Sequence, residues 1–106
     1  MASSREYVEF VLEQCEGLSA RAMMGEYVLY FQGKTVGGVY DNRLLVKPTP
    51  SAKTLMPNAE WELPYEGAKE MLLVDNIEDK EFLQKLFKAL HNELPETKKE
   101  KTMGST

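Results

Sequence analysis

The sequence predicts an α+β fold, in which an antiparallel meander of β-strands lies between an N-terminal and a C-terminal helix. Two observations support this prediction. Residues 22–48 alternate short apolar runs with turn dipeptides, which is typical of consecutive β-hairpins. Residues 4–16 and 82–94 instead carry apolar side chains at helical spacing. A chain of 106 residues holds one domain, which we place at residues 1–95.

Composition restricts the class of protein. The net charge of −4 disfavours a dedicated nucleic-acid binder, which usually carries a basic surface. Cys15 is the single cysteine, so no intramolecular disulfide can form, as in many proteins of a reducing compartment. The first residues lack the apolar stretch of a signal peptide, and no apolar run is long enough to span a bilayer. We therefore expect a cytoplasmic protein that does not associate with membranes.

The first predicted helix covers about Ser4–Glu16. Ser3 and Glu6 match a capping box, which satisfies free backbone N–H groups at a helix start, and Gly17 is a suitable C-terminal stop. The apolar stripe of this helix consists of Tyr7, Val8, Val11, Leu12, Cys15 and Leu18. We expect Cys15 to be a small buried apolar side chain and not a nucleophile.

Four strands should follow in a meander. The first is expected at Ala20–Met24, with Gly25 as a bulge or turn. The other three are Glu26–Phe31, Lys34–Tyr40 and Arg43–Lys47, separated by the dipeptides Gln32-Gly33 and Asp41-Asn42. Gly, Asn and Asp tolerate the positive φ angles that tight hairpin turns require.

Two tight turns would fix the register of the strands. The opposed pairs are then Phe31–Lys34, Leu29–Val36, Tyr40–Arg43 and Gly38–Leu45. The face expected beneath the helices holds Val28, Tyr30, Thr35, Gly37, Val39, Leu44 and Val46. The other face mixes aromatic and cationic side chains and holds Tyr27, Leu29, Phe31, Lys34, Val36, Gly38, Tyr40, Arg43, Leu45 and Lys47. The paired glycines 37 and 38 indicate a bulge or the close approach of a helix.

A short helix should follow the meander. Thr49 can cap this helix with Pro50 at its first position. The helix itself should cover Ser51–Met56 and stop before Pro57. Residues 58–64 read as a loop whose tryptophan, Trp61, we expect to cover the core.

The chain should end with a strand and a second long helix. Glu70–Asp75 is expected as a strand, and Asp75 or Asn76 as the cap of the helix. The apolar stripe of that helix consists of Phe82, Leu83, Leu86, Phe87, Leu90 and Leu94. Pro95 lies just past its end. Residues 96–106 are polar and mixed in charge, and we expect them to be disordered.

No catalytic, cofactor or metal site is predicted. His91, the one histidine, lies near a helix C-terminus, where a surface role is expected. No Cys/His cluster has the spacing of metal ligands. Sequence distance leaves a Cys15–His91 pair open, but nothing favours it. Helix capping explains the acidic group of Asp75, Glu78 and Asp79 without a metal.

Four segments carry a resemblance to a known family. Arg21–Tyr30 (RAMMGEYVLY), Gly33-Lys34, Arg43–Lys47 (RLLVK) and Pro64–Gly67 (PYEG) resemble motifs of the TfoX N-terminal domain family, across about Arg5–Leu94. The resemblance implies helix, meander, helix, strand and helix in that order, as in type III secretion chaperone-like domains. Longer TfoX/Sxy proteins add a C-terminal domain and are associated with activation of natural-competence genes. The family implies no catalytic residues.

The leading hypothesis is therefore a non-enzymatic, cytoplasmic regulatory or interaction domain that acts by protein contact. The candidate surface is the aromatic and basic sheet face around Tyr27, Tyr40, Arg43 and Lys47. One alternative is a weak nucleic-acid binder using the same face, where aromatic rings stack on bases and cations meet phosphates. A small-ligand binder is a further alternative. The expected partner is another protein, or a second copy that pairs through this face or an edge strand.

Overall fold

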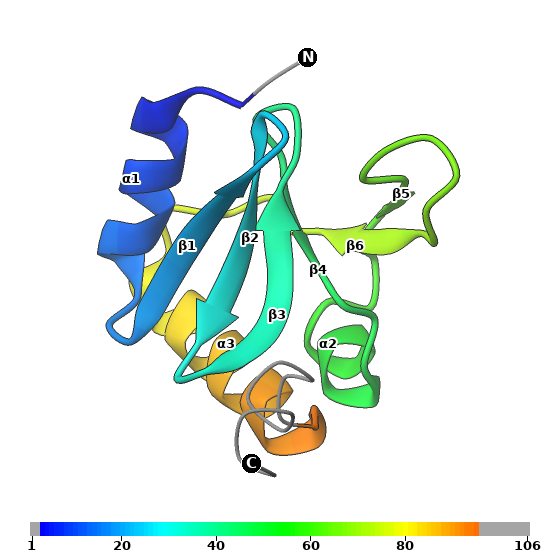
Figure 1. Cartoon of the computed structure of the whole chain (residues 1–106). Coiled ribbons are helices and arrows are strands. Elements are labelled where there is room, and N and C mark those ends of the chain that lie inside the picture. Colours follow the sequence, from blue (N-terminus) through cyan, green and yellow to red (C-terminus); the bar gives the residue numbers. More distant parts are fainter. Residues whose placement is uncertain (1–2, 96–106) are drawn as a thin grey trace, which may run out of the picture.

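The computed structural model describes residues 3–95, so the expectation for residues 96–106 lies outside the described part. Its elements are the helices α1 (Arg5–Gln14), α2 (Pro50–Leu55) and α3 (Lys80–Glu93), and the strands β1 (Leu18–Met23), β2 (Glu26–Phe31), β3 (Lys34–Val39), β4 (Leu44–Val46), β5 (Trp61–Glu62) and β6 (Met71–Leu73). The strands form one antiparallel sheet in the order β1-β2-β3-β4-β6-β5 (Figure 1). The α+β prediction is confirmed.

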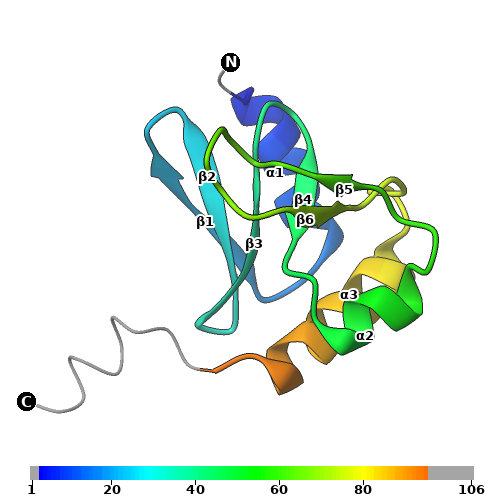
Figure 2. The ribbon, with the colours of Figure 1, turned by 90° about the vertical axis from the view of Figure 1, so that its right-hand side faces the viewer.

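Helices α1 and α3 pack against one face of the sheet and leave the other face open (Figures 1 and 2). The core lies between these two layers and α2 covers part of α3. The buried apolar side chains of this core come from all three helices, four strands and the connecting segments: Val8, Val11, Cys15, Leu29, Phe31, Val36, Val39, Leu44, Val46, Ala52, Leu72, Val74, Leu83, Leu86, Phe87 and Leu90. Cys15 is a small buried apolar residue, as predicted.

Three two-residue turns build the meander. Both turn residues have positive φ in Met24-Gly25, Gln32-Gly33 and Asp41-Asn42, which is the geometry of the tight hairpins that suit twisted strands. The last two were predicted. The first was expected only as a bulge or turn at Gly25, because a methionine is not a usual turn residue.

The predicted pairing of Leu29 with Val36 is wrong. Phe31 does oppose Lys34, but the register shifts next, and Leu29 opposes Gly37. This β-bulge places Val36 as an extra residue in β3. It allows Val36 and Val39, which are three residues apart, to reach the same core.

Because of this bulge, part of the predicted assignment of side chains to the two faces of the sheet is wrong. Five residues predicted on the mixed face lie on the helix-covered face instead: Tyr27, Leu29, Phe31, Lys34 and Val36. Val28, Tyr30 and Thr35 lie on the open face, because they alternate with core-facing neighbours. From Gly37 to Val46 the predicted faces are correct, since the hairpin of β3 and β4 keeps its predicted register.

The glycine pair makes room for a strand and a ring, and not for a helix. A Cβ atom on Gly37 would clash with the carbonyl oxygen of Leu45 in β4. A Cβ atom on Gly38 would lie 2.5 Å from the Tyr40 ring on the open face. The close neighbours are therefore main chain and an aromatic side chain.

The helix caps differ partly from those predicted. Ser4, and not Ser3, caps α1 by accepting a hydrogen bond from the Tyr7 N–H. Thr49 caps α2 with Pro50 at its first position, as predicted. Asp79 caps α3 through the Phe82 N–H, so α3 begins later than a cap at Asp75 or Asn76 would allow.

The predicted loop at 58–64 contains a strand. Residues Trp61 and Glu62 form β5 and pair with β6 at the sheet edge. Trp61 does not cover the core, since 47% of the residue is exposed. The Lys53 ammonium lies 5.7 Å from the centre of its ring. Strand β6 is shorter than predicted.

Within residues 3–95, no helix combines the length and the apolar character needed to cross a membrane.

Candidate functional site

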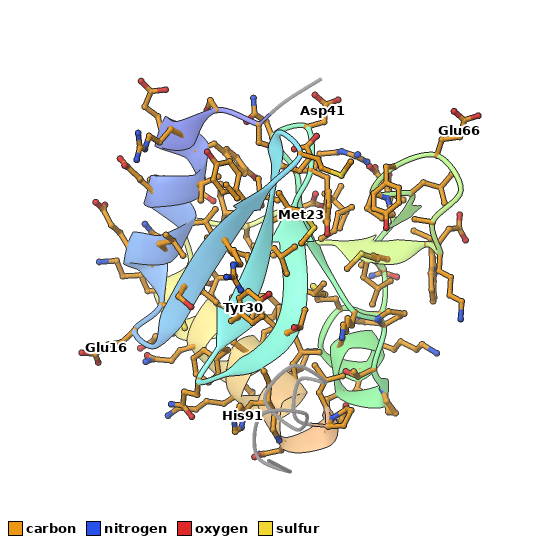
Figure 3. All side chains as sticks on the ribbon, viewed as in Figure 1. Glu16, Met23, Tyr30, Asp41, Glu66 and His91 are labelled. Carbon is orange, nitrogen blue, oxygen red and sulfur yellow. The ribbon has the colours of Figure 1, made fainter. Side chains whose placement is uncertain are left out.

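A groove of about 420 Å³ opens on the uncovered side of the sheet. Its lining consists of Met23, Met24, Glu26, Tyr27, Val28, Tyr40 and Tyr65. We call it the Met–Tyr groove. These residues come from the β1–β2 hairpin, the end of β3 and the connection between β5 and β6. Figure 3 shows Met23 on the open face, with Asp41 and Glu66 toward the same end of the molecule.

Met24 is the most unusual residue of the groove. It lies at the tip of the β1–β2 hairpin with a φ of 54° and is 97% exposed. L-residues rarely adopt this left-handed conformation, which costs roughly 1–2 kcal/mol. Neighbouring Met23 is 50% exposed. The hairpin therefore presents two flexible, polarisable side chains to solvent.

A pair of tyrosines, Tyr40 and Tyr65, also lines the groove. The ring centres of Tyr40 and Tyr65 are 6.0 Å apart at an angle of 57°. Gly38 leaves room for the Tyr40 ring, because a Cβ atom there would lie 2.5 Å from it. Tyr65 is 62% exposed.

The surroundings of the Tyr40 hydroxyl disfavour its ionisation. Burial raises the pKa of Tyr40 above its ordinary value, and the proximity of Tyr65, Glu26 and Tyr30 raises it further. Of these neighbours only Glu26 is a carboxylate, so it is the one that would also attract a positively charged group.

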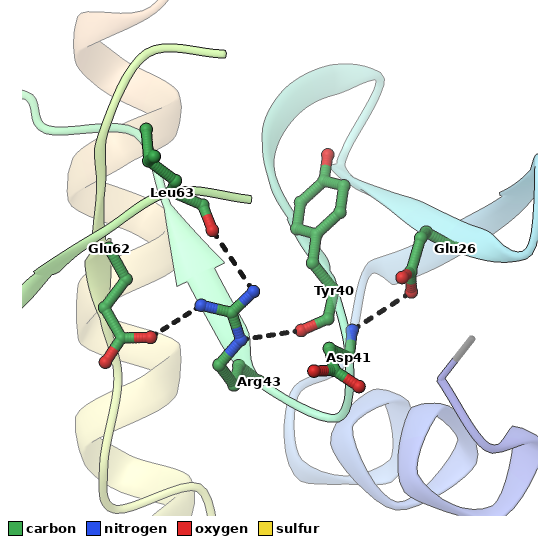
Figure 4. Close-up of polar contacts among 6 residues, drawn as sticks. All are labelled: Glu26, Tyr40, Asp41, Arg43, Glu62 and Leu63. Atoms are coloured by element: carbon green, nitrogen blue, oxygen red, sulfur yellow. Dashed lines mark hydrogen bonds and ion pairs between the residues drawn. The ribbon is translucent and has the colours of Figure 1, made fainter. Parts of the chain in front are cut away.

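Glu26 is held in place by hydrogen bonds to one carboxylate oxygen. Its Oε1 accepts the Ser3 hydroxyl at 2.7 Å and the Asp41 N–H at 3.1 Å; Figure 4 shows the second of these. Ser3 also accepts the Asn42 N–H at 3.0 Å. Both bonds of Glu26 use Oε1, so neither occupies its second oxygen.

Arg43 ties the β3–β4 hairpin to the chain that carries Tyr65. Its guanidinium lies 2.6 Å from the Glu62 carboxylate and donates to the Leu63 carbonyl at 3.1 Å. Its Nε donates to the Tyr40 carbonyl at 3.0 Å (Figure 4). The side chains of Arg43 and Glu62 are about a quarter exposed, at 28% and 26%. Arg43 therefore positions both tyrosine-bearing segments.

The four residues predicted as an interaction surface are only partly together. Tyr27 and Tyr40 both line the groove, although the Tyr27 side chain packs toward the core. Arg43 lies beside them and is engaged in the contacts described above. Lys47 follows the end of β4 and is not among the lining residues. Its partial burial lowers the pKa of its ammonium group.

Sequence reasoning missed Met23, Met24, Glu26 and Tyr65. A methionine directly before Gly25 was the available signal, because a two-residue turn there would expose its side chain. Tyr65 could not be found, because the segment that carries it is placed by Arg43 and not by a local pattern.

Cys15 and His91 both pack against other side chains of the fold. Burial raises the pKa of the Cys15 thiol above its ordinary value, which disfavours the reactive thiolate. The His91 ring lies edge-on against Phe31 at 5.9 Å, and its carbonyl accepts the Lys34 ammonium at 2.9 Å. Among residues 3–95, no three His, Cys, Asp or Glu side chains are grouped as metal ligands would be.

Comparison with known proteins gives one family and one relative. The model of the TfoX N-terminal domain matches residues 11–92. A Spirochaeta aurantia protein described as "Uncharacterized 12.7 kDa protein in trpE 5'region" is 36% identical over 110 residues. The aligned region covers this whole chain and 96% of that protein. No solved structure matches.

Proposed function

The chain belongs to the TfoX N-terminal domain family, and from this premise we propose that it is a non-enzymatic regulatory domain that acts by contact with another protein. The proposed contact surface is the Met–Tyr groove. It replaces the wider sheet face, because Arg43 is engaged within the chain and Lys47 lies apart from the groove.

The observation that carries this proposal is the exposure of the Met24 side chain at the tip of the β1–β2 hairpin. A large apolar side chain is almost fully exposed on a turn whose backbone it does not suit. A methionine at this position stabilises neither the core nor the turn. Residues in a backbone conformation that is unfavourable for their side chain, with no compensating gain in stability, are often found at functional sites.

The surroundings of Met24 support the same proposal. Exposed tyrosine and methionine side chains are enriched in protein interfaces, where they bury large areas. A volume of about 420 Å³ is within the usual range of binding pockets. Cytoplasmic action is the remaining part of the proposal, supported by Cys15 as a free thiol.

Affinity capture with matched variants tests the proposal. The tagged chain, Met24→Asn, Tyr65→Ser and the control Glu81→Gln would each be incubated with lysate, with and without nuclease. Glu81 lies in the first turn of α3, outside the groove. We expect a protein that is enriched by the unchanged chain and by Glu81→Gln, and at least about fivefold less by both groove variants, since interface anchors contribute about 1 kcal/mol or more.

Two outcomes would contradict the proposal. Equal capture by groove variants and control would place the contact elsewhere. Capture that disappears with nuclease would favour nucleic-acid binding. Arg43→Glu is unsuitable as a groove variant, because it would put a carboxylate against Glu62 and displace the segment that carries Tyr65.

A further inference from the structure

The Met–Tyr groove combines apolar and aromatic walls with one carboxylate, that of Glu26. We infer that it binds an arginine side chain presented by the partner protein. This inference rests on the proposed function, whose contact it specifies. Three features of the groove carry it: its wall chemistry, its charge, and the absence of an ion pair to Glu26 among residues 3–95.

The walls match the shape of arginine. Tyr65 offers a largely exposed ring, and a planar guanidinium stacks on aromatic faces. The methionines Met23 and Met24 line the same groove. Their flexible side chains can pack along the aliphatic stem of an arginine, which is itself apolar.

The charge of the groove favours a cationic ligand. Glu26 is the one charged residue among the described residues that line it, and its Oε1 is fixed by Ser3 and Asp41. Asp41 and Glu66, which follow the two tyrosines in the sequence, are exposed and add negative charge to the segments that carry those tyrosines. An acidic partner side chain would be repelled here, whereas a guanidinium can pair with a carboxylate while it stacks.

The cations beside the groove do not pair with this charge. Arg21 lies opposite Val28 on the open face and is in none of the ion pairs of residues 3–95. Arg43 pairs with Glu62 at 2.6 Å and donates to two main-chain carbonyls. Its positive charge is therefore already balanced by Glu62. The carboxylate of Glu26 has no such cationic partner among the ion pairs of residues 3–95.

A pair of isosteric peptides tests the inference directly. The probes are Ac-Leu-Arg-Leu-NH2 and Ac-Leu-Cit-Leu-NH2, in which the neutral citrulline replaces arginine at nearly the same shape. The ε-methyl NMR signals of Met23 and Met24 report on binding, and Met56, outside the groove, is the internal reference. We expect saturable shifts of Met23 and Met24 in the millimolar range with the arginine peptide, and about tenfold weaker binding of the citrulline peptide, from lost cation–π and charged contacts.

Variants identify the groups responsible. Glu26→Gln removes the charge while retaining a side-chain oxygen that can accept the bonds of Ser3 and Asp41. Glu81→Gln changes the net charge of the chain equally but lies outside the groove. We expect Glu26→Gln to reduce the preference for arginine to about threefold or less, and Glu81→Gln to retain it. Tyr65→Leu should weaken the arginine peptide more than the citrulline peptide, because only the cation interacts with the ring quadrupole.

Several results would overturn the inference: no saturable shift at Met23 and Met24, equal binding of the two peptides, or equal losses in Glu26→Gln and Glu81→Gln. The peptide comparison needs no variant, so a folding defect in one variant does not affect it. If partner capture is lost in Met24→Asn but the arginine peptide fails to bind, the arginine assignment is wrong and the proposed protein contact stands.

Discussion

Individual backbone conformations decide where side chains are exposed. Met24 and Gly25 both have positive φ, yet only glycine adopts this region without a steric cost. A methionine here destabilises the chain by crowding its own Cβ against the following carbonyl. Its near-complete exposure means that few contacts offset this cost.

At the residue scale, we therefore predict that Met24→Asn stabilises the fold. Asparagine is enriched in the left-handed region, so the free energy of unfolding should rise by about 0.5–1 kcal/mol. Urea unfolding followed by circular dichroism measures the change. A destabilised variant would mean that the Met24 side chain makes contacts that its exposure does not indicate. Together with loss of partner capture, a gain in stability would separate function from folding at one position.

Helix starts depend on one side chain aimed at free N–H groups. Among the acidic residues before α3, Asp79 accepts the Phe82 N–H at 3.1 Å. Asn76 contributes only its main-chain carbonyl, which accepts the Asp79 N–H at 3.2 Å. Sequence pattern alone could not choose among these candidates, because Asp75, Asn76 and Asp79 are all suitable caps.

At the element scale, we predict that Asp79→Ala destabilises the chain by about 1 kcal/mol, the usual effect of losing an N-cap. Asn76→Ala is the matched control and should change stability by less than about 0.5 kcal/mol, as expected for an exposed residue without a side-chain role. Thermal unfolding of both variants under the same conditions gives the comparison. If Asn76→Ala is the more destabilising, the helix begins earlier than the structure indicates.

On the scale of the whole molecule, Arg43 joins parts that are distant in sequence. It links the end of β3 to Glu62 and Leu63 and thereby places the chain that carries Tyr65 over the open face. This link is partly buried, so it is screened less by solvent than a surface ion pair. The shape of the Met–Tyr groove depends on it.

We predict that Arg43→Gln loosens residues 61–67 without unfolding the sheet. Loss of the charged hydrogen bonds should increase amide hydrogen exchange in this segment by about tenfold or more. The control is Arg5→Gln, whose exposed ion pair with Glu9 is expected to contribute little. Exchange measured by mass spectrometry tests both. Unchanged exchange in Arg43→Gln would show that the segment is held by other contacts.

Elements with a local signal could be predicted from the sequence. The three helices, the hairpin turns at Gln32-Gly33 and Asp41-Asn42 and the order of every element except β5 follow from periodicity and turn residues, which act between near neighbours. The cap of α2 follows in the same way from Thr49 and Pro50. The family was also identified from short motifs of the sequence, and the match over residues 11–92 confirms it.

The tertiary structure alone decided the faces of the sheet and the groove. The extra residue Val36 shifts the pairing of β2 with β3 by one residue. Because side chains alternate between the two faces of a sheet, this shift puts the side chains of β2 on the face opposite to the predicted one. Whether that bulge forms depends on burying Val36 and Val39 in one core, a long-range packing requirement. Met24, Glu26, Tyr40 and Tyr65 meet for the same reason: the turns and the Arg43 link bring together segments that no local pattern connects.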